Sequence, residues 1–247
     1  MLEGIHKIHL IGIGGSGMRA IANILIQKGY EVSGSDVKES DVIERFRQMG
    51  ATVHIGHNAD YVQGVDAVVR STAIREDNPE IVAAKEQGIT ILHRSDIVKA
   101  VLDVTNGIAV AGAHGKTSTT SMIGQILVEG QMEPTVIIGG EVDYLKGSSC
   151  LGKGEYSVVE ADESDGSFLK LRPKTIVITN IEDDHMDHYK TMENLLNAFC
   201  QFVETLPVDG KAVVCGDNDN IRYVMSKVER QFITYGLEES NDYVAKN

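Results

Sequence analysis

The chain has 247 residues, 42% hydrophobic and 24% charged, which is the composition of a globular protein with a sizeable core. Its formal net charge of −13 argues against a nucleic-acid partner, because both molecules would be strongly anionic. No apolar run reaches the ~18 residues of a membrane span, and the N-terminus lacks the layout of a signal peptide. Three widely spaced cysteines indicate reduced thiols, so we expect a cytoplasmic protein, with no obligate protein partner evident.

The first predicted element is an apolar strand from Lys7 that leads into a glycine loop. That loop satisfies the pattern G-x-G-x-x-G with Gly12, Gly14 and Gly17, and a helix ending at Gly29 follows it. The next strand ends at Asp36, where a dinucleotide-binding fold places the acidic residue that meets a ribose. The loop therefore predicts nucleotide binding, with NAD, FAD and a UDP-sugar all open. The alternative is a βαβ unit whose glycines serve packing alone.

Strands and helices then alternate up to about residue 102, which predicts a parallel, doubly wound sheet. The expected strands are 52–55, 66–70 and 90–92, and the expected helices are 41–50, 78–88 and 95–102. A short polar stretch from Asp103 to Asn106 precedes a new apolar strand. We therefore predict two domains, 1–103 and 104–247.

The second glycine loop follows the expected strand 107–111 and opens a helix over 117–128. The helix carries apolar residues at Met122, Ile123, Ile126 and Leu127, a helical spacing. The loop fits G-x-x-G-K-T, although the full Walker pattern would need a glycine where Val110 stands. Its N–H groups would bind phosphate, Lys116 would reach the β- and γ-phosphates, and the Thr117 hydroxyl would bind Mg²⁺. A glycine-rich turn with an incidental lysine is the alternative, but the strand–loop–helix context favours ATP or GTP.

Two acidic clusters follow apolar strands later in the chain. The strand 157–160 ends in Glu160, Asp162, Glu163 and Asp165, and the strand 175–178 is followed by the run Asn180 to His188. Either cluster alone is better read as a solvated loop. Because both follow a buried strand beside a phosphate loop, they favour a site for Mg²⁺. His185 and His188 fit a surface position equally well.

The strand–helix alternation continues to the end of the chain. The expected elements are a core helix at 192–206, a strand at 211–215, a helix at 221–228 and a strand at 232–235, and no closing element is expected after them.

The motifs together resemble the Mur ligase family over the whole chain. The matching segments are Gly12 to Met18, Gly34 to Asp36, Ser71 to Ile74, Gly112 to Thr117, Glu160 to Asp165 and Asn180 to Asp187. The histidine before Gly-Lys-Thr and the Asp-His-x-Asp segment are the most specific of them. Two positions depart from the usual family pattern, Ala113 and Ser118, where threonine is common; both changes are conservative enough to leave phosphate binding intact.

The resemblance implies an α/β fold, with a Rossmann-like doubly wound parallel sheet followed by a P-loop NTPase-like domain. Residues 1–103 would bind the UDP-sugar and residues 104–247 would be an incomplete ATP-binding central domain. The family's C-terminal domain, with the contacts to adenine and to the amino acid, would lie after Asn247. The chain would then be a fragment or a truncated product, inactive alone.

The implied reaction is ATP-dependent ligation of an amino acid to the carboxylate of UDP-N-acetylmuramate through an acyl phosphate, in peptidoglycan synthesis. The Gly-Gly-Ser-Gly-Met form of the first loop favours L-alanine as the amino acid over the substrate of the murein tripeptide ligase. Two other classes stay open: a nicotinamide-dependent oxidoreductase fused to an NTPase, and a non-catalytic nucleotide sensor.

The resemblance also implies the site residues. Lys116, Glu160 and His185 would be catalytic, and Mg²⁺ would bind Thr117, Glu160 and His185, with Glu163 as a substitute for Glu160. ATP would contact Gly112, Ala113, His114, Gly115, Lys116, Thr117, Ser118 and Asn180. The UDP-sugar would contact Gly14, Gly15, Ser16, Gly17, Met18, Asp36, Ser71 and Thr72. Several family members carry a carbamylated lysine on the helix that here spans 192–206; this helix has no lysine, and the position falls at or near Cys200.

Overall fold

The computed structural model describes residues 1–246, which form two compact units. The first unit is Met1–Ala100 with Ile137–Leu151, and the second is Val101–Val136 with the chain from Gly152 onward. The chain leaves the first unit after Ala100, close to the boundary predicted at residue 103. The segment Ile137–Leu151, which the sequence analysis placed in the second domain, is grouped with the first unit.

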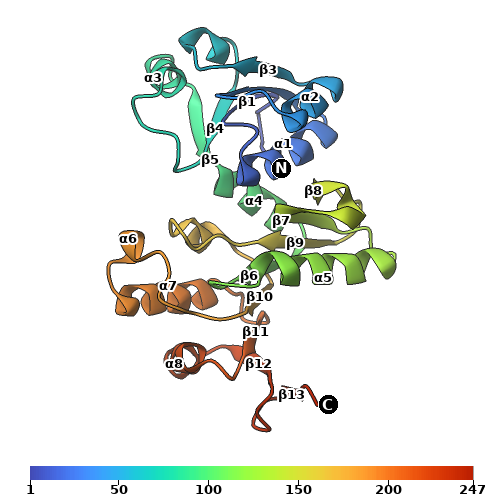
Figure 1. Ribbon diagram of the computed structural model, residues 1–247, viewed down its shortest axis with the longest axis vertical. Helices are drawn as coiled ribbons and strands as arrows, with labels where there is room; N and C mark the ends of the chain where they lie inside the picture. The colour runs from blue at the N-terminus through green and yellow to red at the C-terminus, as the bar shows by residue number, and fades with distance from the viewer. Residues whose placement is uncertain (247) are drawn as a thin grey trace. The chain divides into compact units, whose positions relative to one another are not determined.

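The first unit contains a five-stranded sheet in the order β3-β2-β1-β4-β5, with every neighbouring pair parallel (Figure 1). The strands are β1 (Lys7–Ile11), β2 (Glu31–Asp36), β3 (Thr52–Ile55), β4 (Ala67–Arg70) and β5 (Thr90–His93). The connecting elements are α1 (Ser16–Gln27), α2 (Asp41–Gln48), η1 (Ala59–Val62), α3 (Pro79–Glu86) and α4 (Arg94–Leu102). The predicted doubly wound sheet is confirmed.

This strand order reverses between β1 and β4, and ligands of such sheets bind at the carboxyl ends of the strands beside that reversal. The first glycine loop follows β1, and the segment Ser71 to Ile74 follows β4. A Cβ atom at Gly12 would lie 3.5 Å from the Ile74 side chain, so the two loops are neighbours. The topology therefore brings the predicted UDP-sugar residues to one edge of the sheet.

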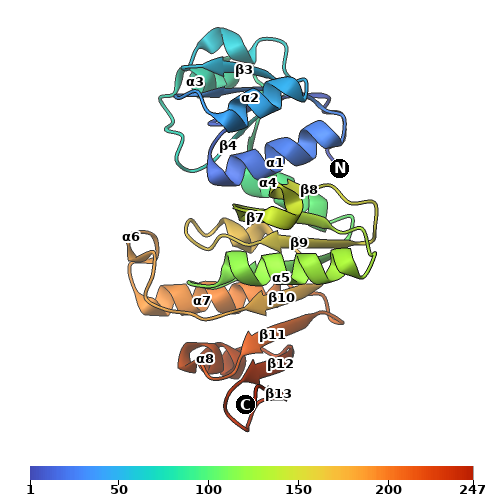
Figure 2. The same ribbon diagram turned by 45° about the vertical axis from the view of Figure 1, so that its right-hand side comes forward.

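The second sheet has eight strands in the order β13-β12-β11-β10-β6-β9-β7-β8 (Figure 2). The strands are β6 (Asn106–Ala111), β7 (Thr135–Val142), β8 (Gly147–Cys150), β9 (Tyr156–Glu160), β10 (Thr175–Ile178), β11 (Lys211–Cys215), β12 (Gln231–Gly236) and β13 (Tyr243–Val244). The helices are α5 (Lys116–Glu129), α6 (Met186–Tyr189), α7 (Met192–Glu204) and α8 (Asp219–Lys227), with short 3₁₀ turns η2 (Asp143–Leu145) and η3 (Ser167–Lys170). From β9 through β6 and β10 to β13, adjacent strands run parallel.

The strand β6 lies between β9 and β10, so the loops after these three strands meet at one sheet edge. These loops are the phosphate loop and the two acidic clusters. Ile123 and Leu127 of α5 pack on Val110, Val158 and Val177, one from each of the three strands. Helix α5 thereby covers this part of the sheet and presents its N-terminus at the same edge.

Three features differ from the sequence expectations. Met122 and Ile126 share the apolar spacing of α5, yet they are 58% and 69% exposed. The strand β8 was not expected, because Gly147-Ser148-Ser149-Cys150 has no apolar alternation. The final stretch, expected to lack a closing element, contains the two-residue strand β13.

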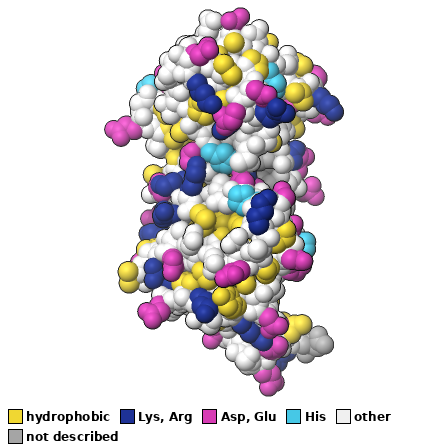
Figure 3. Space-filling view, turned by 90° about the vertical axis from the view of Figure 1, so that its left-hand side faces the viewer, with side chains coloured by type: hydrophobic (Ala, Val, Ile, Leu, Met, Phe, Trp, Pro, Cys, Tyr) yellow, Lys and Arg dark blue, Asp and Glu magenta, His cyan; other side chains and the backbone are white. Residues whose placement is uncertain are grey.

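Within residues 1–246, none of the helices combines the length and the apolar character needed to span a membrane. On the face drawn in Figure 3, acidic and basic side chains are interspersed rather than gathered by sign.

Candidate functional site

The N-termini of α1 and α5 differ from those of α2, α3, α7 and α8. Each of these four helices begins with a capping side chain that accepts a hydrogen bond from a backbone N–H of the first turn. The capping residues of α2, α3, α7 and α8 are Ser40, Asn78, Thr191 and Asn218, respectively. Helices α1 and α5 begin at Gly15 and Gly115, which provide no such cap. Their first-turn N–H groups therefore stay open to an external acceptor, and the helix dipole makes an anion the favoured one.

Gly112 brings the phosphate loop against the end of β10. It has a φ of +130°, and a Cβ atom there would lie 2.2 Å from Thr179 Oγ1 and 2.8 Å from Asn180 O. Any other residue would clash with this backbone, so glycine is required by close approach as well as by conformation. Gly115 has a φ of +80° at the turn into α5, which favours glycine again.

Thr179 and Asn180 hold the centre of the loop. The Thr179 hydroxyl donates to His114 O at 2.6 Å, and Asn180 Nδ2 donates to the same oxygen at 3.0 Å. The His114 N–H donates to Asn180 Oδ1 at 2.9 Å. The His114 ring is exposed and lies 3.5 Å from a carboxylate oxygen of Glu182. The loop conformation is thus fixed by the segment that follows β10, and sequence reasoning missed the part of Thr179 in this.

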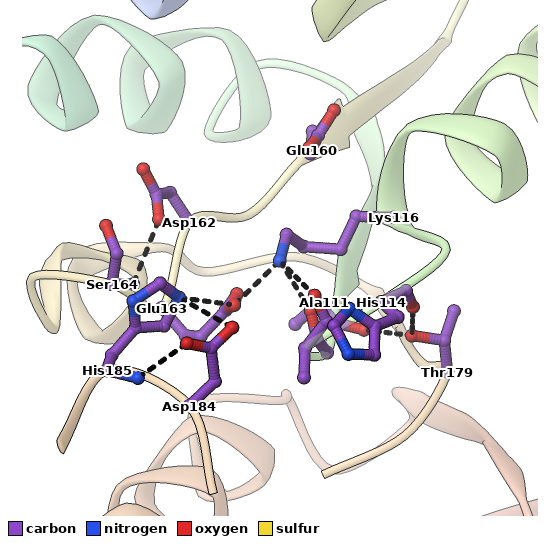
Figure 4. Close-up of polar contacts among 12 residues, drawn as sticks. Ala111, His114, Lys116, Glu160, Asp162, Glu163, Ser164, Thr179, Asp184 and His185 are labelled. Atoms are coloured by element: carbon purple, nitrogen blue, oxygen red, sulfur yellow. Dashed lines mark hydrogen bonds and ion pairs between the residues drawn. The ribbon is translucent and has the colours of Figure 1, made fainter. Parts of the chain in front are cut away.

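Lys116 is held by the loop and by Glu163. Its Nζ atom donates to Gly112 O at 2.6 Å, to Ala113 O at 3.2 Å and to Glu163 Oε1 at 2.7 Å. Figure 4 shows Glu163 between Lys116 and His185. The ammonium group therefore lies against the backbone of the loop that the sequence predicts to bind phosphate.

Glu163 is buried, with 2% of its side chain exposed. Burial raises the pKa of its carboxyl group, while the hydrogen bond from Lys116 opposes that shift. Among the described residues, Glu163 Oε2 has no hydrogen-bond partner. The backbone of Glu163 is fixed by the buried Tyr189 hydroxyl, which donates to Glu163 O. Burial also raises the pKa of Tyr189. An anionic oxygen without a donor is what a bound cation would satisfy.

Thr117 and Glu160 lie together beside Lys116. The Thr117 hydroxyl lies 3.2 Å and 3.1 Å from the two carboxylate oxygens of Glu160. Hard oxygen donors of this kind suit Mg²⁺, so this pair fits the predicted metal. Residues 1–246 contain no group of three or more His, Cys, Asp or Glu side chains arranged to hold a metal ion. A metal here would therefore have to complete its shell with oxygens from nucleotide and water, as Mg²⁺ commonly does.

His185 lies near one carboxylate of each acidic cluster, Glu163 of the first and Asp184 of the second. Its Nε2 atom is 3.5 Å from Glu163 Oε1 and 3.6 Å from Asp184 Oδ2. Its φ of +57° falls in the left-handed region and starts the one-turn helix α6. The assignment of Thr117, Glu160 and His185 as metal ligands stays a prediction. The structure brings the first two together and places His185 against Glu163.

A small pocket adjoins these residues, and its lining includes Glu163, Asp184 and His185 together with Leu195 and Phe199 of α7. The adjacent Cys200 is partly buried, and burial raises the pKa of its thiol, with Glu204 as a smaller cause. Helix α7 therefore contributes apolar side chains to the pocket. At the position predicted for the carbamylated lysine of some family members it has Cys200, which supplies no carboxylate.

The first glycine loop is tied to β2. The Gly14 N–H donates to Asp36 Oδ2 at 2.9 Å, and a Cβ atom at Gly14 would lie 3.0 Å from that oxygen. A Cβ atom at Gly17 would lie 2.9 Å from the Arg94 guanidinium, which places a cation beside the start of α1. Gly15 and Ser16 are exposed, whereas the side chain of Met18 is buried. Met18 can therefore offer a diphosphate only its backbone.

The remaining predicted contacts follow β4. Ser71 is partly buried and Thr72 is exposed. Ser71 O accepts the Ile74 N–H at 3.1 Å, which closes a turn. Both residues thus lie on the loop that neighbours Gly12, at the edge where the sheet topology predicts a ligand.

Two family models match the chain, one over each part of it. Residues 7–104 match the Mur ligase family, catalytic domain, and residues 110–247 match the Mur ligase middle domain. A UDP-N-acetylmuramate–L-alanine ligase of Desulfatibacillum aliphaticivorans is 45% identical over 240 residues, which is 97% of this chain and 53% of that protein. The protein of that name from Lawsonia intracellularis is 46% identical, over 98% of this chain and 53% of its own length.

Two solved structures are also similar. The UDP-N-acetylmuramate:L-alanyl-gamma-D-glutamyl-meso-diaminopimelate ligase from Neisseria meningitides has a TM-score of 0.88 at 27% identity, over 94% of this chain and 78% of that one. The UDP-N-acetylmuramate-alanine ligase of Thermotoga maritima has a TM-score of 0.84 at 31% identity, over 94% and 53%. The chain spans about half the length of the curated relatives it matches. With both family matches and both folds in agreement, the predicted Rossmann-like and P-loop NTPase-like architecture is confirmed, and the chain belongs to the Mur ligase family.

Proposed function

We propose that this chain carries the UDP-sugar-binding and ATP-binding parts of an enzyme that ligates L-alanine to UDP-N-acetylmuramate in peptidoglycan precursor synthesis. The observation that carries the proposal is the uncapped start of α5, with Lys116 inside the loop and Thr117 against Glu160. The relatives at 45% and 46% identity bear the name of that ligase. ATP and Mg²⁺ are the cofactors we assign.

The reaction has two steps. The substrate carboxylate attacks the γ-phosphorus of ATP, the bond to the β-phosphate oxygen breaks, and an acyl phosphate and ADP form. The L-alanine amine then attacks the acyl carbon, loses a proton and expels inorganic phosphate. Carboxylate and triphosphate repel each other, so the first step depends on cancelling charge and holding the atoms in line.

Several groups of the second unit would cancel this charge and hold the reacting atoms in line. The N–H groups from Gly115 to Ser118 would bind the phosphate oxygens, and the Lys116 ammonium would move from Glu163 to the β- and γ-phosphates. Thr117 and Glu160 would hold Mg²⁺, which when bound neutralises phosphate charge. His185 and Glu163 would serve a second cation near the substrate carboxylate. Asn180 and Thr179 keep the loop in shape through His114.

The first unit would hold the UDP-sugar. Gly14, Gly15, Ser16 and Gly17 would face the diphosphate at the start of α1, with the backbone of Met18. Asp36 would lie near the ribose, and Ser71 and Thr72 near the uridine. The Gly14–Asp36 hydrogen bond supports this, since it holds the acidic residue against the loop.

The murein peptide ligase reaction is the second candidate, because a ligase of that kind has the higher TM-score of the two structures described. The alanine-adding enzyme of T. maritima is more similar in sequence, at 31% against 27%. The first loop also has the Gly-Gly-Ser-Gly-Met form that favours L-alanine. We therefore assign L-alanine to the complete protein.

Titration calorimetry on the chain tests the proposal, with UDP, UDP-N-acetylmuramate, Mg·ATP and NADH as separate ligands. We expect the UDP compounds and Mg·ATP to bind and NADH to bind far more weakly. Lys116→Ala should weaken Mg·ATP binding and leave UDP binding unchanged, which serves as the internal control. Tighter binding of NADH than of UDP would contradict the ligase assignment and favour an oxidoreductase.

A complementary assay concerns the full reaction. We expect the 247-residue chain alone to release no phosphate in response to L-alanine, even with UDP-N-acetylmuramate and Mg·ATP present. Turnover by this chain would contradict our placement of the adenine and alanine contacts in a further domain.

A further inference from the structure

A buried polar cluster surrounds Glu80 in the first unit, outside every residue assigned above. Glu80 lies in the first turn of α3 and is fully buried, as are His9 of β1 and Ser35 of β2. Its Oε2 atom is 2.7 Å from Ser35 Oγ and 3.1 Å from His9 Nε2. Its Oε1 atom is 3.1 Å from His57 Nδ1 and 3.2 Å from Asn58 N.

These four groups can all donate to Glu80, so both carboxylate oxygens are satisfied without water. Burial alone would raise the pKa of Glu80, but the hydrogen bonds from His9, Ser35 and His57 outweigh it and lower that pKa. The residue is therefore an ionised carboxylate in the interior. Buried carboxylates are uncommon because desolvation is expensive, and stability alone is a weak reason for this one.

The cluster ends at the glycine loop. Ser35 donates its hydroxyl to Glu80, and the Ser35 carbonyl oxygen accepts the N–H of Gly12 at 2.8 Å and of Ile13 at 3.1 Å. The next residue, Asp36, accepts the Gly14 N–H through its side chain. One strand end thus takes three successive N–H groups of the loop, and Glu80 holds that strand end in place.

Glu80 also holds the neighbouring strand end. His57 and Asn58 follow β3, and the Gly56 N–H just before them donates to Asp36 O at 2.8 Å. Asp36 is therefore fixed from both sides, by Ser35 and by the Gly56 to Asn58 turn, and both attachments lead to Glu80. The Gly15 N–H is turned inward to Gly12 O at 3.0 Å. Only the N–H groups of the first turn of α1 then remain for an outside anion.

We propose that Glu80 is a positioning residue that fixes the first glycine loop and Asp36 in the conformation that receives the diphosphate and ribose of the UDP-sugar. The inference rests on the proposed function, because it names the ligand of that loop. Glu80 contacts no substrate itself. It acts through Ser35 on the loop and through His57 and Asn58 on the strand end that carries Asp36.

The test compares Glu80→Gln and Ser35→Ala with Ile81→Val. Ile81 is the next residue of α3 and is fully buried, so Ile81→Val perturbs the same helix without touching the cluster. Glu80→Gln keeps the shape but presents an amide to donors that need an acceptor. Ser35→Ala keeps the carboxylate and removes the hydroxyl that donates to it, together with the 3.2 Å contact of that hydroxyl with His57 Nδ1. This variant provides the test if Glu80→Gln does not fold.

Calorimetry with UDP and with Mg·ATP is the first measurement, made on the whole chain. We expect both cluster variants to bind UDP about tenfold more weakly, the size of one hydrogen bond to a charged group, with Mg·ATP binding unchanged. Ile81→Val should bind both ligands as the wild type does. UDP affinities of both cluster variants within about twofold of the wild type would overturn the proposal.

Amide hydrogen exchange without ligand is the second measurement, and it separates this inference from the function on which it rests. We expect faster exchange at Gly12, Ile13 and Gly14 in both cluster variants, and none of that local effect in Ile81→Val. A merely structural role would instead raise exchange across the whole first unit, and that result would overturn the inference. Failure of the wild type to bind UDP would refute the proposed function, while the exchange pattern would still decide whether Glu80 positions the loop.

Discussion

The Lys116 ammonium donates a 2.7 Å hydrogen bond to Glu163, a carboxylate of which 2% is exposed. The pair joins the phosphate loop after β6 to the acidic cluster after β9. Glu163 supplies the charge that Lys116 faces when no nucleotide is present, and Lys116 offsets the burial of Glu163. Each charge therefore stabilises the other when no ligand is bound.

The first prediction concerns the energetics of this pair. Lys116→Ala leaves the Glu163 charge buried without a partner and should lower the free energy of unfolding by about 3 kcal/mol at neutral pH. Glu163→Gln removes the charge that burial disfavours and should cost far less. The double variant should recover much of the loss, with a coupling free energy of about 1–3 kcal/mol. Urea unfolding of the four proteins without nucleotide measures this cycle, and additive effects would contradict the pairing.

The second prediction concerns Thr117. Thr117→Val removes the hydroxyl that lies against Glu160 while keeping the size of the side chain. We expect affinity for Mg·ATP to fall about tenfold or more, and affinity for ATP without Mg²⁺ to change little. Thr117→Ser is the matched control, because it keeps the hydroxyl and should retain Mg·ATP binding. Equal losses in Thr117→Val with and without Mg²⁺ would contradict a role in holding the metal.

The glycine loops were predictable from the sequence because their chemistry is local. Gly112, Gly115 and Lys116 act within a few residues of one another, between a strand and a helix that have clear periodicity. The strand–helix alternation likewise predicted both sheets. The short polar strand β8 was not predicted, because its four residues have no apolar alternation that would indicate a strand in the sequence.

The long-range hydrogen bonds that hold these loops in place could not be predicted in the same way. Thr179 reaches His114, and Glu80 reaches Ser35 and His57, across sequence separations that only the fold closes. One signal for Glu80 was available: an acidic residue at a helix position whose neighbours Ile81 and Ala84 face the core. A charged residue in that position indicates a buried partner, but the sequence does not name it.

The third prediction concerns the pH dependence that Glu80 contributes. Its pKa in the folded chain is lowered from the ordinary value of 4.5, so the folded state favours the ionised form. The resulting stabilisation is fully present above pH 4.5 and is lost as the pH falls through the lowered value. Each unit of lowering corresponds to about 1.4 kcal/mol.

The measurement is the free energy of unfolding of wild type and Glu80→Gln between about pH 3 and 7. Taking the difference removes the contributions of the other carboxylates. We expect the advantage of the wild type to shrink as the pH falls below 4.5. A difference that grows on acidification would contradict the lowered pKa.

The last prediction concerns the second cation and the helix α7. The side chains that α7 presents to the pocket beside Glu163 and His185 are Leu195 and Phe199, and the helix has no lysine that carbon dioxide could convert to a carbamate. Cys200 does not replace that group, because burial raises the pKa of its thiol and Mg²⁺ prefers oxygen to sulfur. The negative charge must then come from carboxylates, of which Glu163 and Asp184 lie nearest to His185.

We therefore expect the complete enzyme to keep its activity in buffer depleted of carbon dioxide, with no increase on addition of bicarbonate. Cys200→Ala should leave the rate unchanged and lower the free energy of unfolding by about 1 kcal/mol, as for the loss of a partly buried side chain. Glu163→Gln should instead lower the rate, because it removes the buried carboxylate beside His185 that we assign to the second cation. Both variants are assayed in the same buffers. Cys200→Ala then reports the effect of lower stability on the rate, and Glu163→Gln reports the loss of a ligand to the second cation. Activity that disappears without carbon dioxide and returns with bicarbonate would place a modified lysine elsewhere in the protein and refute this account.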